Sequence, residues 1–507
     1  MSASSGAFDA NRADFTVGVI GAGAMGQGIV QVSLQGGMNV VLFDAKDGSA
    51  AAGREQVIKR LERLVEKGKL TADAVAAMAD KVSVAGSLAD FSGCHTVVEA
   101  IFENLEVKQQ VFSELENHVS DNCLLTSNTS SLPIGSIARV CKKPERVAGF
   151  HFFNPVPLMR LVEVIRGPGT EEWVMDGLCA LGERMGRTPV KVKDAPGFLV
   201  NFGGRAFTTE GLAVVHEGVA TPAQVDAVMR DCGHFRMGPF QLMDLTGIDV
   251  NYPVSQIVHQ QYSYDPRLRT VPLHKALYDA GRFGRKTGIG HFRYDEKGQE
   301  IDTPSPDHET TAAPAVQVYC AGPASELSDL LAGVSLDETD DGSSPIVAAL
   351  FGEDCSTFAS RMGIDHRRLV AIDVTGDTSK RVTIMSAPGA STEALNAVSA
   401  ALQKNGRKVT AIADSAGFIG QRIRGMVGNL GCEMAQIQIA DPDSIDLAMK
   451  LGLNYPLGPL EIIADLGVER AFAIMAAMHA VSGDDRYRPS VWLRRRAQLG
   501  LDIKTPN

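Results

Sequence analysis

The chain repeats part of itself at a fixed distance of 220 residues, and this repeat constrains its fold more than any other feature. Without a gap, residues of the stretch 162–247 recur in the stretch 382–467. Average residue usage would give only about five identities by chance over a window of this length. The recurring residues of the first copy are Val162, Pro168, Gly169, Gly186, Arg187, Asp194, Gly197, Phe198, Gly211, Pro222, Asp226, Met229, Gly238, Pro239 and Gly247. The repeat therefore predicts a duplicated domain.

Short apolar runs and helical stretches alternate over the first part of the chain, which predicts a mostly parallel sheet covered on both faces. The apolar runs are Phe15 to Ile20, Asn39 to Asp44, His95 to Ile101, Cys123 to Ser127, Val147 to Phe152 and Leu161 to Ile165. Helical patterns such as Met25 to Gln35, Gly53 to Glu66 and Val107 to Val119 separate several of them. After about residue 194 the strand signals stop and helices follow, one of them started by Thr221-Pro222.

The predicted fold class is α/β. A Rossmann-type dinucleotide-binding domain over residues 14–193 precedes an all-α domain over 194–294. A linker rich in Pro, Thr, Asp and Glu follows over 295–316. The repeat then predicts a reduced Rossmann-like domain over 317–393 and a second helical domain over 394–507.

A glycine-rich turn stands directly after the first predicted strand and opens a helix. Its residues Gly21, Ala22, Gly23, Ala24, Met25 and Gly26 match GxGxxG, and Asp44 ends the next strand. In this context the glycines permit a tight turn and close approach of a pyrophosphate to a helix N-terminus. The Asp44 carboxylate would accept the ribose hydroxyls and repel a 2′-phosphate, which favours NAD over NADP. The alternative, a glycine-rich turn beside an exposed aspartate, is the weaker interpretation in this context.

Polar residues follow two later strands of the predicted sheet, where open α/β sheets place their ligands. They are the run Asn128 to Ser131 and His151, with Glu163 twelve positions further on. A histidine with a carboxylate partner can act as a general base near neutral pH. Taken singly, His151 fits a buried structural histidine, Glu163 a surface carboxylate and Ser130 a helix cap. Only their combination points to catalysis.

Several motifs together resemble those of the L-3-hydroxyacyl-CoA dehydrogenases over about residues 15 to 294. They are GVIGAGAMGQGI, VVEAIFENLEVK, SNTSSLP, HFFNPVPLMRLVEVI, DAPGFLVN and GRKTGIGHF. The resemblance implies that NAD oxidises the C3 hydroxyl of an (S)-3-hydroxyacyl-CoA to a 3-oxoacyl-CoA. Short-chain or dicarboxylic substrates, 3-hydroxybutyryl-CoA or 3-hydroxyadipyl-CoA, are implied, within fatty-acid or phenylacetate catabolism.

The resemblance also assigns roles to individual residues. His151 would take the hydroxyl proton and Glu163 would orient the imidazole, while Ser130 and Asn201 would hold substrate oxygens. On the cofactor side it implies Glu103, Lys108, Asn128 and Lys286. The protein would position the reacting atoms, and the hydride chemistry belongs to the cofactor.

A basic helical stretch from Arg54 to Leu70 corresponds to the CoA-contacting helix of the family, although its local pattern differs. It carries Lys59, Arg60, Arg63, Lys67 and Lys69. These side chains could clamp the CoA phosphates. They could equally form a solvated helix face supported by the i,i+4 pair of Glu55 and Lys59. Both interpretations stay open at this point.

The second copy lacks the residues to which catalysis is assigned. The ungapped shift places Leu350, Ala371, Thr383 and Gln421 opposite Ser130, His151, Glu163 and Asn201, and no glycine fingerprint precedes the second copy. We expect this copy to be inert. The arrangement resembles the longer bacterial members of the family. Since shorter members pair through their helical domains, we expect the second copy to pack on the first as an internal pseudo-dimer, within a possible homo-oligomer.

Composition excludes several other classes of protein. With 49 Lys+Arg against 60 Asp+Glu, the net charge is 49 − 60 = −11, which argues against a nucleic-acid partner. There is no apolar run of membrane-spanning length and no secretory signal, so we expect a cytoplasmic protein without a membrane partner. The 8 cysteines are scattered without a CxxC pair, which predicts reduced thiols and no bound metal. The alternatives are a dehydrogenase of a non-CoA β-hydroxyacid and a non-catalytic NAD-binding protein.

Overall fold

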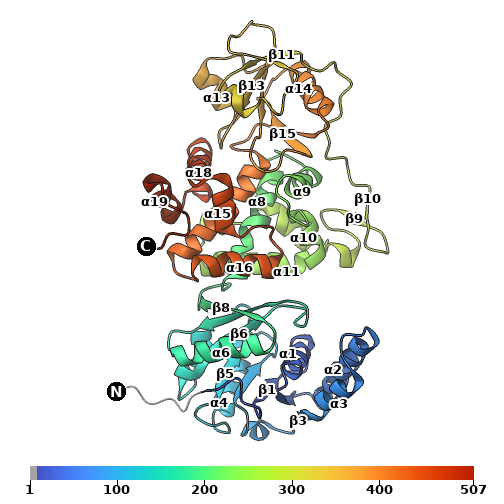
Figure 1. Cartoon of the computed structure of the whole chain (residues 1–507), viewed down its shortest axis with the longest axis vertical. Helices are drawn as coiled ribbons and strands as arrows, with labels where there is room; N and C mark the ends of the chain where they lie inside the picture. Colours follow the sequence, from blue (N-terminus) through green and yellow to red (C-terminus); the bar gives the residue numbers. More distant parts are fainter. Residues whose placement is uncertain (1–7) are drawn as a thin grey trace. The chain divides into compact units, whose positions relative to one another are not determined.

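The computed structural model of the chain describes residues 8–507. It divides into two compact units (Figure 1). The first unit runs to Phe202 and also contains Gln438–Leu453, a segment from the second copy of the repeat. The second unit comprises Gly203–Ile437 and Asn454–Asn507. The division therefore does not follow the order of the chain, because one helix of the second copy belongs with the first sheet.

The first unit is built on an eight-stranded sheet in the order β3-β2-β1-β4-β5-β6-β7-β8. Neighbouring strands are parallel except β6 and β7, which are antiparallel. The strands are β1 (Thr16–Ile20), β2 (Asn39–Phe43), β3 (Val82–Val84), β4 (Thr96–Glu99), β5 (Leu124–Ser127), β6 (Val147–Phe152), β7 (Leu161–Arg166) and β8 (Thr188–Lys193). The reversal at β6 and β7 brings two strands that are adjacent in sequence directly side by side.

Helices cover this sheet as the alternation of patterns predicts. They are α1 (Ala24–Gln35), α2 (Ser49–Glu66), α3 (Ala72–Asp80), α4 (Leu105–Leu115), α5 (Ile134–Ala138) and α6 (Glu172–Arg184). The apolar side chains of β1, β2 and α1 are buried together, and Phe15, Val17 and Ile29 are fully enclosed. Burial of this apolar area is the main stabilising contribution to the unit.

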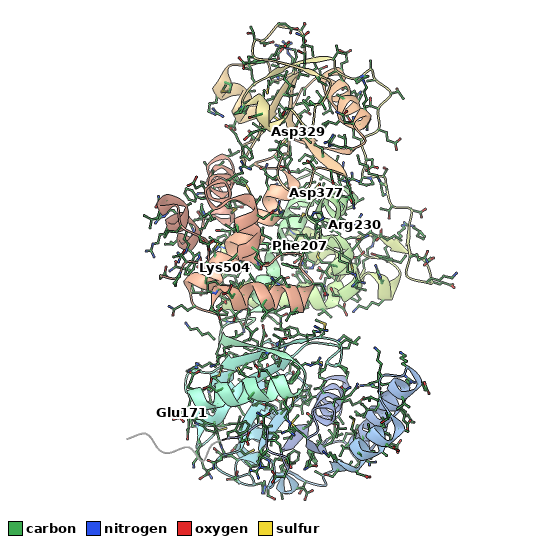
Figure 2. All side chains as sticks on the ribbon, viewed as in Figure 1. Glu171, Phe207, Arg230, Asp329, Asp377 and Lys504 are labelled. Carbon is green, nitrogen blue, oxygen red and sulfur yellow. The ribbon has the colours of Figure 1, made fainter. Side chains whose placement is uncertain are left out.

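Most of the second unit consists of helices from both copies of the repeat. The first copy supplies α8 (Arg205–His216), α9 (Pro222–Asp231), α10 (Pro239–Thr246), α11 (Ile248–Gln261) and α12 (Pro272–Asp279). The second supplies α15 (Ile419–Gln436), α17 (Pro459–Leu466), α18 (Val468–Ser482) and α19 (Val491–Leu499). α8 packs against α15, and these helices overlap when the chain is shifted by 220 residues. Phe207 on α8 is buried and its ring stacks on Phe235 (Figure 2).

A six-stranded sheet completes the second unit, in the order β12-β11-β13-β14-β15-β16. Its strands are β11 (Gln317–Cys320), β12 (Ser335–Asp337), β13 (Ile346–Ala349), β14 (Leu369–Ile372), β15 (Arg381–Met385) and β16 (Lys408–Ile412), with α13 (Cys355–Met362) and α14 (Thr392–Lys404). From β13 onward it reproduces β5 to β8, including an antiparallel β14–β15 pair. It is the reduced Rossmann-like sheet that the sequence predicts.

Each helical copy contributes one helix to the sheet of the other copy. In the first unit, α16 (Pro442–Leu453) contacts β7 and β8. In the second unit, the corresponding helix of the first copy, α9, contacts β15.

The segment expected to be a linker is attached to the second sheet over part of its length. It begins with a small hairpin of β9 (Arg293–Tyr294) and β10 (Glu300–Ile301). Further on, the Asp307 carboxylate pairs with Arg381 at 2.7 Å, and the His308 N–H donates to the Val409 carbonyl. This part is thus held by specific polar contacts, which its composition alone does not reveal.

Within residues 8–507, no helix combines the length and the apolar character needed to cross a membrane.

Candidate active site

The glycine-rich turn between β1 and α1 has the geometry that a dinucleotide site requires. Gly21 has a φ of 107°, and a Cβ there would lie 2.5 Å from the Ala100 carbonyl oxygen. A Cβ on Gly26 would lie 1.8 Å from the Gly21 oxygen, so only glycine fits. At Gly23, by contrast, a Cβ would meet nothing within 4 Å. The open space beside Gly23 leaves room for a phosphate against the backbone.

The start of α1 is suited to an anion. Its N-cap is Gly23, and no side chain caps the first turn. The free N–H groups and the helix dipole therefore face the open space and favour a pyrophosphate. These residues fit the cofactor that the sequence predicts.

Asp44 lies just after β2, beside the same turn. Its Oδ2 accepts the Ala22 N–H at 2.8 Å, and its Oδ1 accepts the Lys46 N–H at 2.9 Å. The carboxylate is therefore held next to the phosphate-binding turn. A fixed negative charge at this place suits ribose hydroxyls and disfavours a 2′-phosphate.

His151 and Glu163 are directly opposite each other on the antiparallel strands β6 and β7. The His151 Nδ1 lies 2.7 Å from the Glu163 Oε2. His151 is only 6% exposed and Glu163 is fully buried. The two residues predicted as a base and its partner thus form a buried cross-strand pair.

Backbone groups of the next segment hold the second oxygen of Glu163. The N–H groups of Leu199 and Val200 donate to its Oε1 at 3.2 and 2.9 Å. The chain reaches this position through a turn in which Gly197 and Phe198 both have positive φ, 71° and 48°. Both carboxylate oxygens are therefore used, which fixes the orientation of the imidazole partner.

Glu103 organises the loop that follows β5. Its Oε1 accepts the Thr129 hydroxyl at 2.6 Å, the N–H groups of Ser130 and Ser131 at 3.1 and 3.0 Å, and the Ser131 hydroxyl at 2.9 Å. Burial would raise the pKa of Glu103, but the Thr129 hydroxyl and the Lys108 ammonium outweigh it and lower the pKa. Glu103 is therefore a carboxylate that shapes this loop.

Lys108 is buried between two carboxylates. Its ammonium is 2.6 Å from Glu99 and 3.4 Å from Glu103. Glu99 in turn accepts the Ser127 hydroxyl at 2.6 Å and the Ile101 N–H at 2.7 Å. Glu99 was missed by the sequence interpretation, although a carboxylate at the end of a buried strand is a signal that could have found it.

The remaining predicted residues of the first unit gather at the carboxyl ends of β5 and β6. The Asn128 Oδ1 accepts the Phe152 N–H at 2.8 Å. The Asn201 amide reaches the Ser130 carbonyl oxygen at 3.4 Å. Ser130 itself is exposed. Ser130, Asn128 and Asn201 are thus brought close to the pair of His151 and Glu163.

Lys286 is the exception, because it belongs to the second unit. There its ammonium pairs with the Asp249 carboxylate and lies 5.9 Å from the centre of the Phe283 ring. Its role toward the cofactor stays a prediction.

A cavity of about 510 Å³ lies along the basic face of α2 in the first unit. Its wall includes the basic side chains Arg60, Arg63, Lys67 and Lys69 and the loop Asn154–Leu158 that follows His151. Arg60 is oriented by the Gln27 side chain at 2.8 Å. Of the basic residues singled out in the sequence, Lys59 does not line the cavity. A hollow lined by several cations favours the phosphate clamp over a solvated helix face.

The second copy keeps the framework of this site without its chemistry. Gln421 donates to the Leu350 carbonyl at 2.8 Å, as Asn201 does to Ser130, 220 residues earlier. Asp414 accepts the Cys355 N–H at the start of α13, just as Asp194 accepts the Gly135 N–H near the start of α5. The repeated aspartate therefore holds a helix terminus in both copies.

One position of the predicted correspondence is wrong. β14 and β15 pair with Ala371 opposite Met385, so Asp373 lies opposite Thr383, and the Asp373 N–H donates to the Thr383 carbonyl. The loop between these strands is two residues shorter than in the first copy, which the ungapped shift could not detect. The counterpart of His151 is therefore Asp373. Burial raises the pKa of Asp373 above its ordinary value.

Comparison with known proteins decides the family. The sequence model of the 3-hydroxyacyl-CoA dehydrogenase NAD binding domain matches residues 16–195. That of the 3-hydroxyacyl-CoA dehydrogenase C-terminal domain matches twice, at residues 197–294 and 417–505. The chain belongs to the 3-hydroxyacyl-CoA dehydrogenase family. It is an NAD-dependent oxidoreductase whose helical domain is duplicated.

Relatives extend over almost the whole chain. The 3-hydroxyadipyl-CoA dehydrogenase of Escherichia coli K12 is 35% identical over 96% of this chain and 98% of its own. A probable 3-hydroxybutyryl-CoA dehydrogenase of Bacillus subtilis is 40% identical over 55% of this chain and 97% of its own. The crystal structure of 3-hydroxybutyryl-CoA dehydrogenase from Escherichia coli K12 aligns with a TM-score of 0.85 at 33% identity, covering 96% of this chain and 98% of that chain.

Proposed function

We propose that this member of the family oxidises the C3 hydroxyl of an (S)-3-hydroxyacyl-CoA to the 3-oxoacyl-CoA. The observation that carries the proposal is the buried pair of His151 and Glu163 beside Asn128 and Ser130, in the same unit as the glycine turn. NAD, when bound, supplies the hydride acceptor.

His151 is the proposed general base. Its Nδ1 is engaged by Glu163, so the proton on that nitrogen stabilises the tautomer in which Nε2 carries the free lone pair. Nε2 then takes the proton of the C3 hydroxyl. Glu163 stabilises the imidazolium that results, and because it is held by two backbone N–H groups, it cannot turn away from the ring.

Ser130 and Asn201 are proposed to hold the substrate oxygens. Glu103 sets the Ser130 backbone by accepting its N–H, and Asn201 contacts the Ser130 carbonyl. On the cofactor side we propose Asn128, Glu103, Lys108 and Lys286, in addition to the turn Gly21 to Gly26 and Asp44. The network around Lys108 assigns it an indirect part, in which its charge keeps Glu103 ionised.

The basic cavity along α2 is proposed to bind the phosphates of CoA. Arg60, Arg63, Lys67 and Lys69 line it together with Asn154 and Pro155, which directly follow the strand of His151. Binding there would place a long, flexible ligand alongside the catalytic pair.

The test is NADH oxidation with acetoacetyl-CoA in the wild type and in His151→Ala. We expect turnover to fall by roughly 10²- to 10⁴-fold, the usual contribution of a general base. His118→Ala is the matched control and should keep wild-type turnover. Undiminished activity of His151→Ala would remove this residue from the mechanism.

The identity of the acyl chain is a separate question. The names of the relatives point to 3-hydroxybutyryl-CoA or 3-hydroxyadipyl-CoA. Comparing kcat/KM on acetoacetyl-CoA and 3-oxoadipyl-CoA decides between them. A dehydrogenase of a free β-hydroxyacid would work equally well without the CoA group, and a non-catalytic NAD-binding protein would show no turnover on any of these substrates.

The second copy is proposed to be an inert internal partner of the first. Supporting this, α8 packs against α15, and Thr383 and Leu350 stand where Glu163 and Ser130 stand in the first copy. We also propose that the protein works in the cytoplasm, which fits the eight cysteines, none of them joined in a disulfide in the part of the chain that the structure describes.

A further inference from the structure

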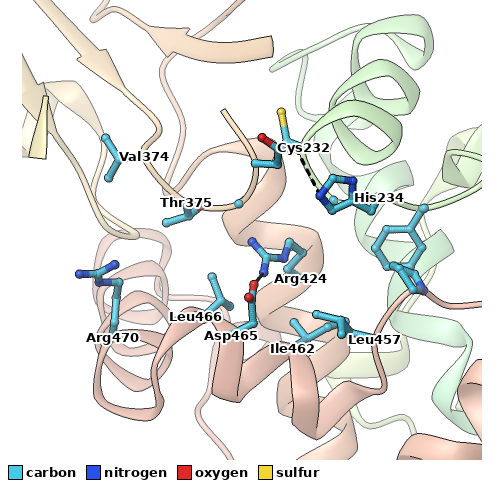
Figure 3. Close-up of a pocket in the computed structure, with 15 residues that line it drawn as sticks. Cys232, His234, Val374, Thr375, Arg424, Leu457, Ile462, Asp465, Leu466 and Arg470 are labelled. Carbon is cyan, nitrogen blue, oxygen red and sulfur yellow. Dashed lines mark hydrogen bonds and ion pairs between the residues drawn. The ribbon is translucent and has the colours of Figure 1, made fainter. Parts of the chain in front are cut away.

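A second cavity, distinct from the site described above, lies wholly within the second unit and has a volume of about 400 Å³ (Figure 3). Three segments form it: the turn after α9, the loop after β14, and parts of α15, α17 and α18. Thr375 lines it and donates to Asp373, the counterpart of His151. The cavity therefore adjoins the place where the catalytic pair would stand if the second copy were active.

Arg424 on α15 projects into this cavity. The residue is 5% exposed, and its Nη2 pairs with the Asp465 carboxylate. In the described part of the chain, no group accepts a hydrogen bond from its Nη1. Figure 3 shows the guanidinium between Thr375 and Asp465. A buried guanidinium N–H without an acceptor is costly, so an acceptor brought by a ligand would be bound favourably.

The other charges around the cavity limit which anion fits. Arg470 lies on the opposite side from His234 in Figure 3, and its guanidinium is 5.0 Å from the centre of the Phe351 ring. The carboxylates of Asp465 and Asp377 also line the cavity, and Asp377 faces His234 at 3.4 Å. Because two carboxylates stand close by, a dianion such as phosphate would be repelled more strongly than a monoanion.

The rest of the wall is apolar, which sets the body of the ligand. The apolar residues are Phe235, Val374, Pro456, Leu457, Ile462 and Leu466. Such a lining with a few convergent polar groups is typical of small-molecule sites of this size. We propose that this cavity binds a short-chain aliphatic monocarboxylate, whose carboxylate accepts the free N–H of Arg424 while its chain lies against the apolar wall.

The proposal is tested by isothermal titration of the full-length protein with hexanoate as the probe. We expect saturable binding of hexanoate, and much weaker binding of hexanol and of inorganic phosphate. Arg424→Gln should weaken hexanoate binding by about 10- to 100-fold, as for the loss of a hydrogen bond to a charged group. Leu457→Trp, which fills the cavity and leaves Arg424 in place, should abolish it.

Arg361→Gln is the matched control, because Arg361 is an exposed arginine of α13 outside the cavity, and it should bind hexanoate as the wild type does. The turnover of acetoacetyl-CoA should stay the same in all three variants, since none of these residues lies in the catalytic site. If Arg424→Gln does not fold, Leu457→Trp decides. Wild-type affinity in the folded cavity variants, no binding to the wild type, or preference for phosphate would each overturn the proposal.

Discussion

Phe235 and Tyr455 occupy equivalent positions in the two copies of the repeat, and their rings are in contact, with centroids 5.1 Å apart. In a two-fold symmetric interface, a residue touches its own counterpart only near the axis. The two aromatic residues therefore mark an approximate two-fold axis between the helical copies. A single chain thus contains the kind of interface that usually joins two subunits.

Two backbone hydrogen bonds have the reciprocal pattern that such an axis requires. The Lys193 N–H donates to the Ile439 carbonyl at 2.8 Å, and the Ala413 N–H donates to the Val219 carbonyl at 3.0 Å. Adding 220 to Lys193 gives position 413, and subtracting 220 from Ile439 gives position 219. Each copy therefore borrows the segment before one helix of the other copy, which explains why α16 belongs to the first unit.

Arg422 holds the two copies together at a buried polar cluster, and its loss should destabilise the second unit. Its guanidinium contacts Glu210 at 2.8 Å and Glu217 at 2.7 Å, and Glu210 is fully buried. Arg422→Met would leave a buried carboxylate short of its main partner, at a cost of about 3 kcal/mol. Urea denaturation measures this loss. Arg422→Met combined with Glu210→Gln should recover part of it, and equal stability of the single variant and the wild type would contradict the prediction.

Deletion of residues 300–507 should yield an insoluble or unfolded fragment. The deletion removes α15, which covers α8, and α16, which covers β7 and β8. Apolar faces of α8 and of the first sheet would then be exposed to water, and such patches cause aggregation. Size-exclusion chromatography with an activity assay is the measurement. A stable and fully active monomer would refute the role assigned to the second copy.

Glu163→Gln should lower kcat by roughly 10²- to 10⁴-fold. A glutamine has one acceptor oxygen, but the site presents the imidazole on one side and the N–H groups of Leu199 and Val200 on the other. One side must therefore face the amide NH₂, which disturbs the imidazole or the turn. Steady-state kinetics with acetoacetyl-CoA test this. Glu114→Gln, at an exposed position of α4, is the matched control and should change nothing.

Asp44→Ala should weaken the discrimination between NAD and NADP. The substitution removes the fixed negative charge beside the turn and also the acceptor of the Ala22 N–H. We expect the ratio of kcat/KM for NADH to kcat/KM for NADPH to fall by about tenfold or more, a loss of about 1.4 kcal/mol of selectivity. Asp47→Ala, at an exposed position nearby, should leave the ratio unchanged. An unchanged ratio in Asp44→Ala would refute the role of this carboxylate.

His274 should make the second unit sensitive to acid. Burial, with a smaller contribution from Arg205, lowers the pKa of His274 to about 4, and the residue is fully enclosed. An unfolded histidine binds its proton near pH 6.5, so between pH 6.5 and 4 the unfolded chain binds more protons than the folded one. Stability therefore falls as the pH falls through this window, by up to about 3 kcal/mol.

The measurement is the thermal denaturation midpoint at several pH values between 7 and 4. His274→Leu cannot bind a proton, so its midpoint should fall less steeply with acid than that of the wild type. His366→Leu, at an exposed site, should follow the wild type. Parallel curves for wild type and His274→Leu would show that another group controls the acid response.

The sequence by itself determined the elements that depend on local patterns. Gly21 and Gly26 mark the dinucleotide turn, since only glycine fits where backbone atoms approach so closely. The alternation of apolar runs predicted the first sheet, and the recurrence of residues such as Pro222 and Pro239 predicted the second set of helices. The motifs around His151 pointed to the family that the comparisons show.

Only the tertiary structure decided which of these residues meet. The pairing of β6 with β7 brings His151 opposite Glu163, and a loop two residues shorter brings Asp373, not Ala371, opposite Thr383. Strand register depends on loop length and on the packing of both faces, which a gapless repeat does not record. The exchange of α9 and α16 between the sheets likewise depends on contacts distant in sequence. A repeat thus reveals that a domain is duplicated, but only packing decides which copy each helix covers.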